Sequence, residues 1–169
     1  LASGRGANLF DLDGNRYVDL VAGFGSVLLG HGAPPVLSAI ASQSERLIQG
    51  LGDVYVADVK IELQERLAAL HPGENPRVLI TQSGADALTA ALKTAALATG
   101  KPGIVAMEGS YHGLSYAPLA ACGFRESFRL PFQEQLNRHV RFVPFAASED
   151  GLEDALSRLE EALSRDRPG

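Results

Sequence analysis

The order of apolar and polar residues predicts short strands and amphipathic helices at the start of the chain. Residues 8–20 alternate apolar and charged side chains on either side of Asp13-Gly14, a pair favoured in tight hairpin turns. Residues 36–48 and 57–70 repeat apolar side chains three or four positions apart, which indicates helices with one apolar face. Residues 1–56 are therefore expected to form a segment with a hairpin, a glycine-rich loop and a helix.

A second pattern of strands and helices begins at residue 77. Residues 77–81 are a short apolar, β-branched run, which is typical of a buried strand. A tight turn through Ser83-Gly84 follows, and apolar residues then recur at helical spacing as far as a stop signal at Gly100. Residues 103–107 and 140–145 have the profile of further strands, and residues 150–164 that of a helix.

This alternation of strands and helices predicts the fold class. A helix between two strands favours a right-handed β-α-β unit. We therefore expect an α/β fold, in which a mainly parallel sheet with crossover helices is preceded by the hairpin-and-helix segment.

The turn at Ser83-Gly84 is a candidate anion site. A helix that starts directly after a strand presents unpaired backbone N–H groups and the positive end of its dipole. Gly84 has no Cβ, so a phosphate could approach the backbone closely. The alternative is a plain cap, in which Ser83 accepts a backbone hydrogen bond and Gly84 eases the turn. Tyr111-His112-Gly113 follows the strand at 103–107, and ligands of open α/β sheets bind beyond the carboxyl ends of the strands.

Composition narrows the classes of partner and compartment. The net charge is -5 and no basic cluster occurs, which argues against a nucleic-acid partner. The single cysteine, Cys122, cannot form an internal disulfide and is expected to be a buried, inert thiol in a reducing, cytoplasmic setting. The four histidines lack metal-ligand spacing, so we predict no metal site. Glycines and prolines interrupt the uncharged stretch 20–44, so no membrane span is expected.

Three common motifs of nucleotide or hydrolytic chemistry are absent. Gly23 and Gly25 begin a dinucleotide fingerprint, but Leu28 stands where its third glycine is required. No Gly-Lys-Ser/Thr sequence occurs, which excludes a Walker A loop, and no Gly-x-Ser-x-Gly elbow occurs. The glycine-rich loop therefore needs another explanation.

Four motifs, in the same order along the chain, resemble the N-terminal half of a class III aminotransferase, a pyridoxal-phosphate enzyme of the type I fold. They are residues 9–20, residues 29–34, residues 83–87 with Lys93 in the same helix, and residues 111–113. The resemblance implies that residues 57–169 are the first part of a truncated large cofactor-binding domain, and that the chain is an N-terminal portion only. Residues 166–169, which follow a helix, are accordingly expected to be a cut end. The resemblance also implies a homodimer, because active sites of this family are built across a two-fold interface.

The resemblance gives five residues a role in binding pyridoxal 5'-phosphate. By position, the backbone N–H groups of Gly84 and Ala85 would hold the cofactor phosphate, with Ser83 nearby. Tyr111 would stack on the pyridine ring, and His112 would support Tyr111 or the pocket wall. Each role is an expectation from the matching motif.

Three further residues have two interpretations each. By resemblance, the glycine-rich loop lines the substrate side of the pocket, which makes Phe24 and Ser26 candidate substrate neighbours, within the same subunit or the partner's. The alternative is a glycine-rich connector in which Phe24 belongs to the core. Asp86 occupies a position that is acidic in the family, and it also suits a helix start through its charge alone.

No catalytic residue is assigned within this chain. A pyridoxal-phosphate aminotransferase needs a Schiff-base lysine and an acid that pairs with the pyridinium nitrogen. In the family both lie further along, and the lysines present are Lys60, Lys93 and Lys101. Lys60 lies on the polar side of its helix, and Lys93 is more than two turns beyond the phosphate turn. We therefore expect this piece to be inactive by itself.

The expected activity is transfer of an amino group between an amine or amino acid and a keto acid. Two alternatives stay open from the sequence. One is another reaction on the same fold, such as that of an aminomutase, decarboxylase or racemase. The other is a non-catalytic domain that keeps the fold without the Schiff-base lysine.

Overall fold

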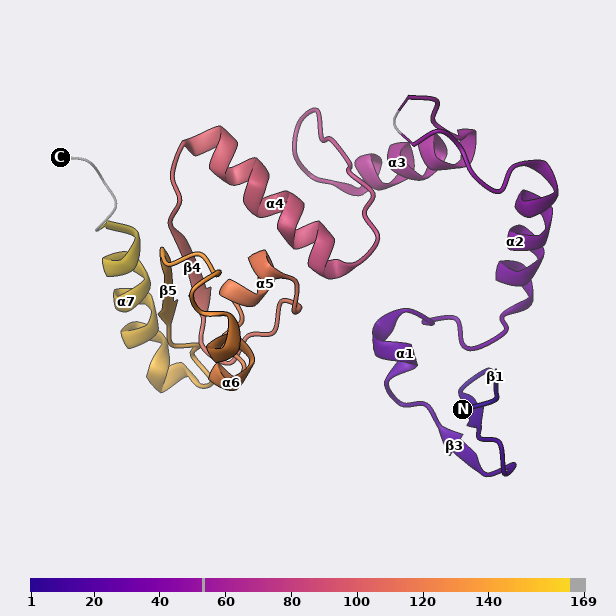
Figure 1. Ribbon diagram of the computed structural model, residues 1–169, viewed down its shortest axis with the longest axis horizontal. Helices are drawn as coiled ribbons and strands as arrows, with labels where there is room; N and C mark the ends of the chain where they lie inside the picture. Colours follow the sequence, from indigo (N-terminus) through magenta and orange to yellow (C-terminus); the bar gives the residue numbers. More distant parts are fainter. Residues whose placement is uncertain (53, 165–169) are drawn as a thin grey trace. The chain divides into compact units, whose positions relative to one another are not determined.

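The computed structural model describes residues 1–52 and 54–164, which belong to two compact units, Leu1–Pro72 and Gly73–Gly169 (Figure 1). The expected boundary between residues 56 and 57 concerns the domains of the resembled family and stays a prediction. Residues 166–169, expected to be a cut end, lie outside the described residues.

The first unit begins with a three-stranded antiparallel sheet. Strands β1 (Ser3–Arg5), β2 (Asn8–Phe10) and β3 (Arg16–Val18) follow one another in the sheet in sequence order. The pairing of β2 with β3 confirms the predicted hairpin, whereas β1 was not predicted. Three residues without an alternating pattern give too weak a signal for a strand.

The hairpin connection is a five-residue loop, residues 11–15, that is ordered by Asp11. Its carboxylate accepts hydrogen bonds from the backbone N–H groups of Asp13 (3.0 Å) and Asn15 (2.9 Å), and from the Tyr17 hydroxyl (2.9 Å). The Asn15 side chain also donates to it, and this bond is the main cause that holds the pKa of Asp11 below its ordinary value. Gly14 lies in the loop with φ of 82°, a conformation that favours glycine.

The described part of the first unit also contains α1 (Ala22–Gly25), a single turn with positive φ, and the helices α2 (Pro34–Arg46) and α3 (Asp58–Leu70). Pro34 opens α2, where its fixed φ and missing N–H are tolerated. Arg46 pairs with Asp58 at 2.8 Å, and this hydrogen bond lowers the pKa of the Asp58 carboxyl. The sequence predicted one apolar face on each of α2 and α3, but no described residue of either helix is buried.

The second unit contains a parallel pair of strands with helices on it. Strands β4 (Ile104–Met107) and β5 (Val140–Val143) pair in parallel from Ile104↔Val140 to Met107↔Val143. Their connection contains α5 (Tyr116–Ala120), α6 (Glu126–Arg129) and the 3-10 helix η1 (Leu130–Phe132). Helix α4 (Gly84–Thr99) precedes β4, and η2 (Glu149–Gly151) and α7 (Leu152–Ser164) follow β5. Strands of a parallel pair joined through helices make this unit α/β, as predicted.

The core of the second unit is built from α5, the residues directly after it and the two parallel strands. Its buried residues are Pro118 to Cys122, together with Ala106 of β4 and Val143 of β5. Cys122 is 0% exposed, as expected for an inert thiol. Helix α7 packs on β5 and β4, with Ala162 buried, and the Arg141 guanidinium donates to the Ala162 carbonyl at 3.0 Å.

The predicted strand at residues 77–81 is wrong for this structure. The segment has no regular secondary structure, Leu79 is 70% exposed, and no described strand forms a ladder with it. The predicted β-α-β unit around α4 is therefore absent, and the parallel crossover runs from β4 to β5 instead. The physical reason is that an apolar run becomes a strand only when a neighbouring strand takes its backbone hydrogen bonds.

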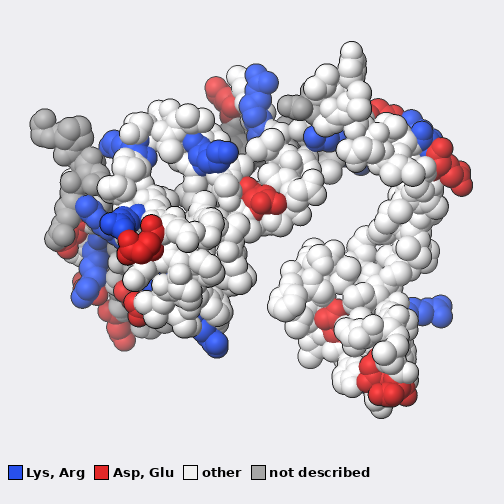
Figure 2. Space-filling view, viewed as in Figure 1, with Lys and Arg blue, Asp and Glu red and all other residues white. Residues whose placement is uncertain are grey.

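Surface charge concerns the expectation about nucleic acid, and helix length concerns the expectation about a membrane span. On the face shown in Figure 2, basic and acidic side chains are interspersed over the second unit, and no continuous basic area is seen there. None of the described helices has the length and apolar character that a membrane crossing requires.

Candidate functional site

The start of α4 is an open helix N-terminus capped by Ser83. Ser83 has extended dihedral angles (φ −158°, ψ 168°), and its hydroxyl oxygen accepts from the Asp86 N–H at 3.1 Å. The Thr81 hydroxyl donates to the Ser83 carbonyl at 3.1 Å, and Ala87 N–H begins the backbone ladder to the same carbonyl. The Ser83 side chain is thus a helix cap, as the plainer interpretation of the sequence predicted.

Two backbone donors remain open beside this cap. Among the described residues, none accepts a hydrogen bond from the N–H groups of Gly84 or Ala85. Gly84 is exposed, and a Cβ built on it would meet nothing within 4 Å. The first turn of this sixteen-residue helix therefore offers two converging donors, the positive end of the helix dipole, and room for an anion.

The loop between β4 and α5 packs directly on this helix start. Gly113 adopts φ of 105°, and a Cβ on it would lie 2.7 Å from the Cβ and 3.3 Å from the Cα of Ala85. The close approach exists only because residue 113 lacks a side chain. The structure thus brings Gly113, which directly follows Tyr111 and His112, to the first turn of α4.

Tyr111 lies in this loop with its ring accessible. Its side chain is 58% exposed, and it contacts Phe124 in a T-shaped geometry with centroids 6.3 Å apart. Phe124 in turn lies against Phe128 at 6.2 Å. His112 is half-buried in the same loop. A ring supported by aromatic neighbours and still exposed is suited to stack on a flat ligand.

Backbone contacts keep this loop in place. The Gly109 N–H donates to the Gly123 carbonyl at 3.1 Å, and the Ser110 hydroxyl donates to the Met107 carbonyl at 2.5 Å. A Cβ on Gly123 would lie 2.4 Å from the Met107 carbonyl oxygen, so the chain passes that strand end closely. The position of Tyr111 is therefore set by the end of β4 as well as by α4.

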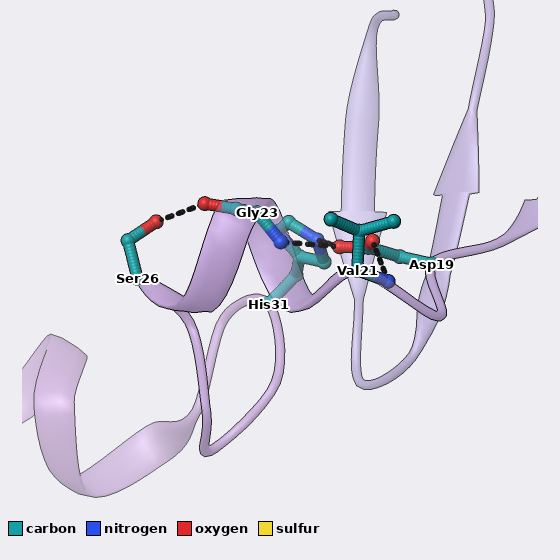
Figure 3. A network of polar contacts seen from close by, with 5 residues as sticks. All are labelled: Asp19, Val21, Gly23, Ser26 and His31. Carbon is teal, nitrogen blue, oxygen red and sulfur yellow. Dashed lines mark hydrogen bonds and ion pairs between the residues drawn. The ribbon is translucent and has the colours of Figure 1, made fainter. Parts of the chain in front are cut away.

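Phe24 and Ser26, the two candidate substrate neighbours, lie in the first unit. Phe24 is 98% exposed, so the alternative that placed it in the core is wrong. The Ser26 hydroxyl donates to the Gly23 carbonyl at 2.6 Å, which closes the turn after Phe24 (Figure 3).

A polar network beside this turn was not predicted from the sequence. Asp19 accepts from His31 Nε2 at 2.8 Å and from the backbone N–H groups of Val21 (3.1 Å) and Gly23 (3.0 Å) (Figure 3). The side chain of Asp19 is 8% exposed, and the hydrogen bond from His31 is the main cause that lowers its pKa. Asp19 and His31 are twelve positions apart, and no spacing rule predicts such a contact.

Lys93, the lysine of α4, does not lie at the start of the helix. Lys93 is exposed on α4, and at 1.5 Å per residue it lies about 13 Å along the axis from Gly84. No cluster of three or more His, Cys, Asp or Glu side chains suited to a metal occurs in the described ranges.

The known proteins that this chain resembles include an aminotransferase and an aminomutase. The chain is 36% identical over 149 residues to an acetylornithine aminotransferase from Methanosarcina acetivorans, covering 88% of this chain and 37% of the relative. It is 37% identical over 124 residues to a glutamate-1-semialdehyde 2,1-aminomutase from Symbiobacterium thermophilum, covering 73% and 28%. The chain thus spans about two fifths or less of the length of these curated relatives.

A solved structure and a family model extend the match over nearly the whole chain. The taurine:2-oxoglutarate aminotransferase from Bifidobacterium kashiwanohense, solved in complex with PLP and glutamate, superimposes with a TM-score of 0.84. The two are 26% identical, and the match covers 96% of this chain and 39% of that one. The model of the family described as aminotransferase class-III matches residues 1–166. By this match and these relatives, the chain belongs to the class III aminotransferase family.

Proposed function

We propose that this chain is the N-terminal, cofactor-holding part of a pyridoxal-phosphate-dependent aminotransferase. The enzyme would move an amino group between an amine or amino acid and a keto acid. The observation that carries the proposal is the open start of α4, where Gly84 and Ala85 present free N–H groups beside the loop that contains Tyr111. A phosphate and a flat aromatic ring are the two parts of pyridoxal phosphate that such a site can hold.

The residues in this chain would bind and orient the cofactor. When bound, the pyridoxal ring supplies an electron sink for the bonds around the amino-bearing carbon. The Gly84 and Ala85 N–H groups would fix the phosphate, and the Tyr111 ring would cover one face of the pyridine. His112, which is half-buried, would support the Tyr111 loop, and the absence of a side chain on Gly84 would leave room for the phosphate.

Several finer features belong to the same proposal. We infer that the Schiff-base lysine comes from sequence outside these 169 residues, so that this piece alone is inactive. Phe24 and Ser26 would neighbour the substrate in a homodimer, and the enzyme would work in the cytoplasm. Residues 77–81, with Leu79 exposed, would join a larger parallel sheet of the complete domain.

An aminomutase is the second candidate, supported by the Symbiobacterium relative. The two reactions differ in their need for an acceptor. A transaminase consumes a keto acid for each amine that it converts, whereas a mutase rearranges one substrate without an added keto acid. Assays of the full-length protein with and without 2-oxoglutarate would separate them.

Cofactor affinity of a Gly84 variant tests the proposal. A Cβ at residue 84 would meet nothing within 4 Å, so we expect Gly84→Val to fold normally while its side chain occupies the space proposed for the phosphate. Gly151→Val is a matched control, since a Cβ there also meets nothing within 4 Å. In titrations of the full-length protein with pyridoxal phosphate, we expect Gly84→Val to weaken binding at least ~10-fold. Equal affinity of the two variants would place the phosphate elsewhere.

A further inference from the structure

The turn that carries Phe24 has an unusual backbone. Ala22, Gly23, Phe24 and Gly25 have φ of 50°, 58°, 56° and 81°, so φ is positive for four residues in a row. Only glycine adopts it without strain, so Ala22 and Phe24 are held in an unfavourable conformation. The Phe24 side chain is 98% exposed, and its own packing therefore does not stabilise the turn. Such strain persists only where surrounding groups determine the conformation.

Asp19 holds this turn from outside, in addition to the hydrogen bonds that the turn makes within itself. One carboxylate oxygen accepts from the Val21 N–H at 3.1 Å and the other from the Gly23 N–H at 3.0 Å, so both bonds are to amides at the start of the turn (Figure 3). The second oxygen is also bonded to His31 Nε2 at 2.8 Å. Hydrogen bonds to an ionised acceptor are stronger than neutral ones, which suits a carboxylate that must hold a strained turn.

His31 ties this carboxylate to the sheet. Its backbone N–H and carbonyl exchange two hydrogen bonds with Gly6, each of 2.8 Å. Its ring lies so close to β1 that a Cβ on Gly4 would be 2.8 Å from the ring's Cγ. The Asp19 N–H donates to the Ala7 carbonyl at 2.8 Å. A continuous set of contacts therefore runs from the sheet through His31 and Asp19 to the turn.

We propose that Asp19 and His31 are positioning residues that hold the left-handed turn and so fix Phe24 as a preformed apolar contact for the substrate. The part that concerns the substrate rests on the proposed function, in which Phe24 neighbours the substrate. Loss of either positioning side chain releases the turn, and Phe24 then no longer selects among substrates by the size of their apolar group. Neither residue touches the substrate in this arrangement.

Hydrogen exchange tests the positioning role of Asp19 and His31 without an activity assay. In the full-length protein, His31→Ala should make hydrogen exchange at the Gly23 amide at least ~10-fold faster. The reason is that the Asp19 carboxylate, which accepts from this amide, loses its hydrogen bond to His31. His31→Gln keeps a donor near the position of Nε2 and should preserve the protection. Asp11→Ala is the matched control: it removes a carboxylate that also accepts from two backbone N–H groups, but in the hairpin loop. Unchanged exchange at Gly23 in both His31→Ala and Asp19→Ala would overturn the proposal.

A double-mutant cycle tests whether these residues act through Phe24. The readout is the ratio of kcat/KM for L-phenylalanine and L-alanine as amino donors, with 2-oxoglutarate as acceptor. We expect His31→Ala to change this ratio at least ~5-fold, His31→Gln to restore it, and His31→Ala to have no further effect in a Phe24→Ala background. Equal effects of His31→Ala in both backgrounds would overturn the proposal. If neither donor reacts, the proposed function loses support, while the exchange experiment still decides whether the pair holds the turn.

Discussion

Gly113→Ala is expected to separate the Tyr111 loop from the start of α4. The substitution adds a Cβ that would lie 2.7 Å from the Ala85 Cβ, well inside normal contact, on a residue with φ of 105°. The left-handed backbone accounts for about 1–2 kcal/mol of the loss in unfolding free energy. Forcing a methyl group into a closed contact adds roughly 1–3 kcal/mol. The total of ~2–5 kcal/mol is a large fraction of the stability of an ordinary domain.

Two variants separate these contributions. Gly109 lies in the same loop with φ of 75°, and a Cβ there would meet nothing within 4 Å. Gly109→Ala should therefore lose only the ~1–2 kcal/mol that the backbone conformation causes. Ala85→Gly should lower the stability of the parent by about 1 kcal/mol through helix propensity, yet make room for the added methyl group in Gly113→Ala. The cycle should show a favourable coupling of ~1–3 kcal/mol between positions 85 and 113.

Urea unfolding of the full-length protein measures the stabilities, and titration with pyridoxal phosphate measures the consequence for binding. Gly113→Ala should weaken cofactor binding more than Gly109→Ala does, because it moves Tyr111 relative to Gly84. If the two alanine variants have the same stability within ~0.5 kcal/mol, and no coupling to Ala85→Gly is found, then the loop does not pack on the helix start.

Three other perturbations have defined outcomes. Tyr111→Ala should weaken pyridoxal-phosphate binding by on the order of 10-fold, because ring stacking and buried apolar area are both lost. Tyr111→Phe keeps the ring, so its affinity for pyridoxal phosphate should stay within ~3-fold of the parent's. Ser83→Ala should lower the unfolding free energy by ~1 kcal/mol in a thermal or urea assay, because the Asp86 N–H loses its acceptor, and Ser83→Asp should restore it. Asp11 and Asp19 have lowered pKa values in the folded protein, so both carboxylates stabilise the folded state. This stabilisation is present above their ordinary pKa near ~4 and is lost as the pH falls through their pKa values in the folded protein. Urea midpoints between about pH 6 and pH 2 should accordingly fall more for the parent than for Asp11→Asn and Asp19→Asn, and parallel curves would contradict this.

The sequence predicted local features well where one short segment contains the whole signal. The hairpin followed from alternation around Asp13-Gly14, and the start of α4 followed from Ser83-Gly84. The contact of Gly113 with Ala85 was not predicted; the sequence indicated only that residues 111–113 follow the end of a strand. In the first two cases the residues that determine the feature are adjacent or obey a fixed periodicity.

Features that depend on partners distant in sequence were not predicted. Residues 77–81 have a strand's composition but form no ladder in the described chain, because pairing is a property of two segments. Asp19 and His31 were not linked, since a loop of irregular backbone joins them. The sequence allowed Phe24 to be a substrate neighbour or a core residue; its 98% exposure contradicts the core, and its place beside the substrate stays a prediction.

The crystal structure of the full-length protein with pyridoxal phosphate would test the central claim most directly. We expect the phosphate oxygens within hydrogen-bonding distance, about 2.7–3.2 Å, of the Gly84 and Ala85 nitrogens, with the Tyr111 ring over one face of the pyridine. A phosphate bound away from the start of α4, or a pyridine ring that Tyr111 does not contact, would contradict the claim.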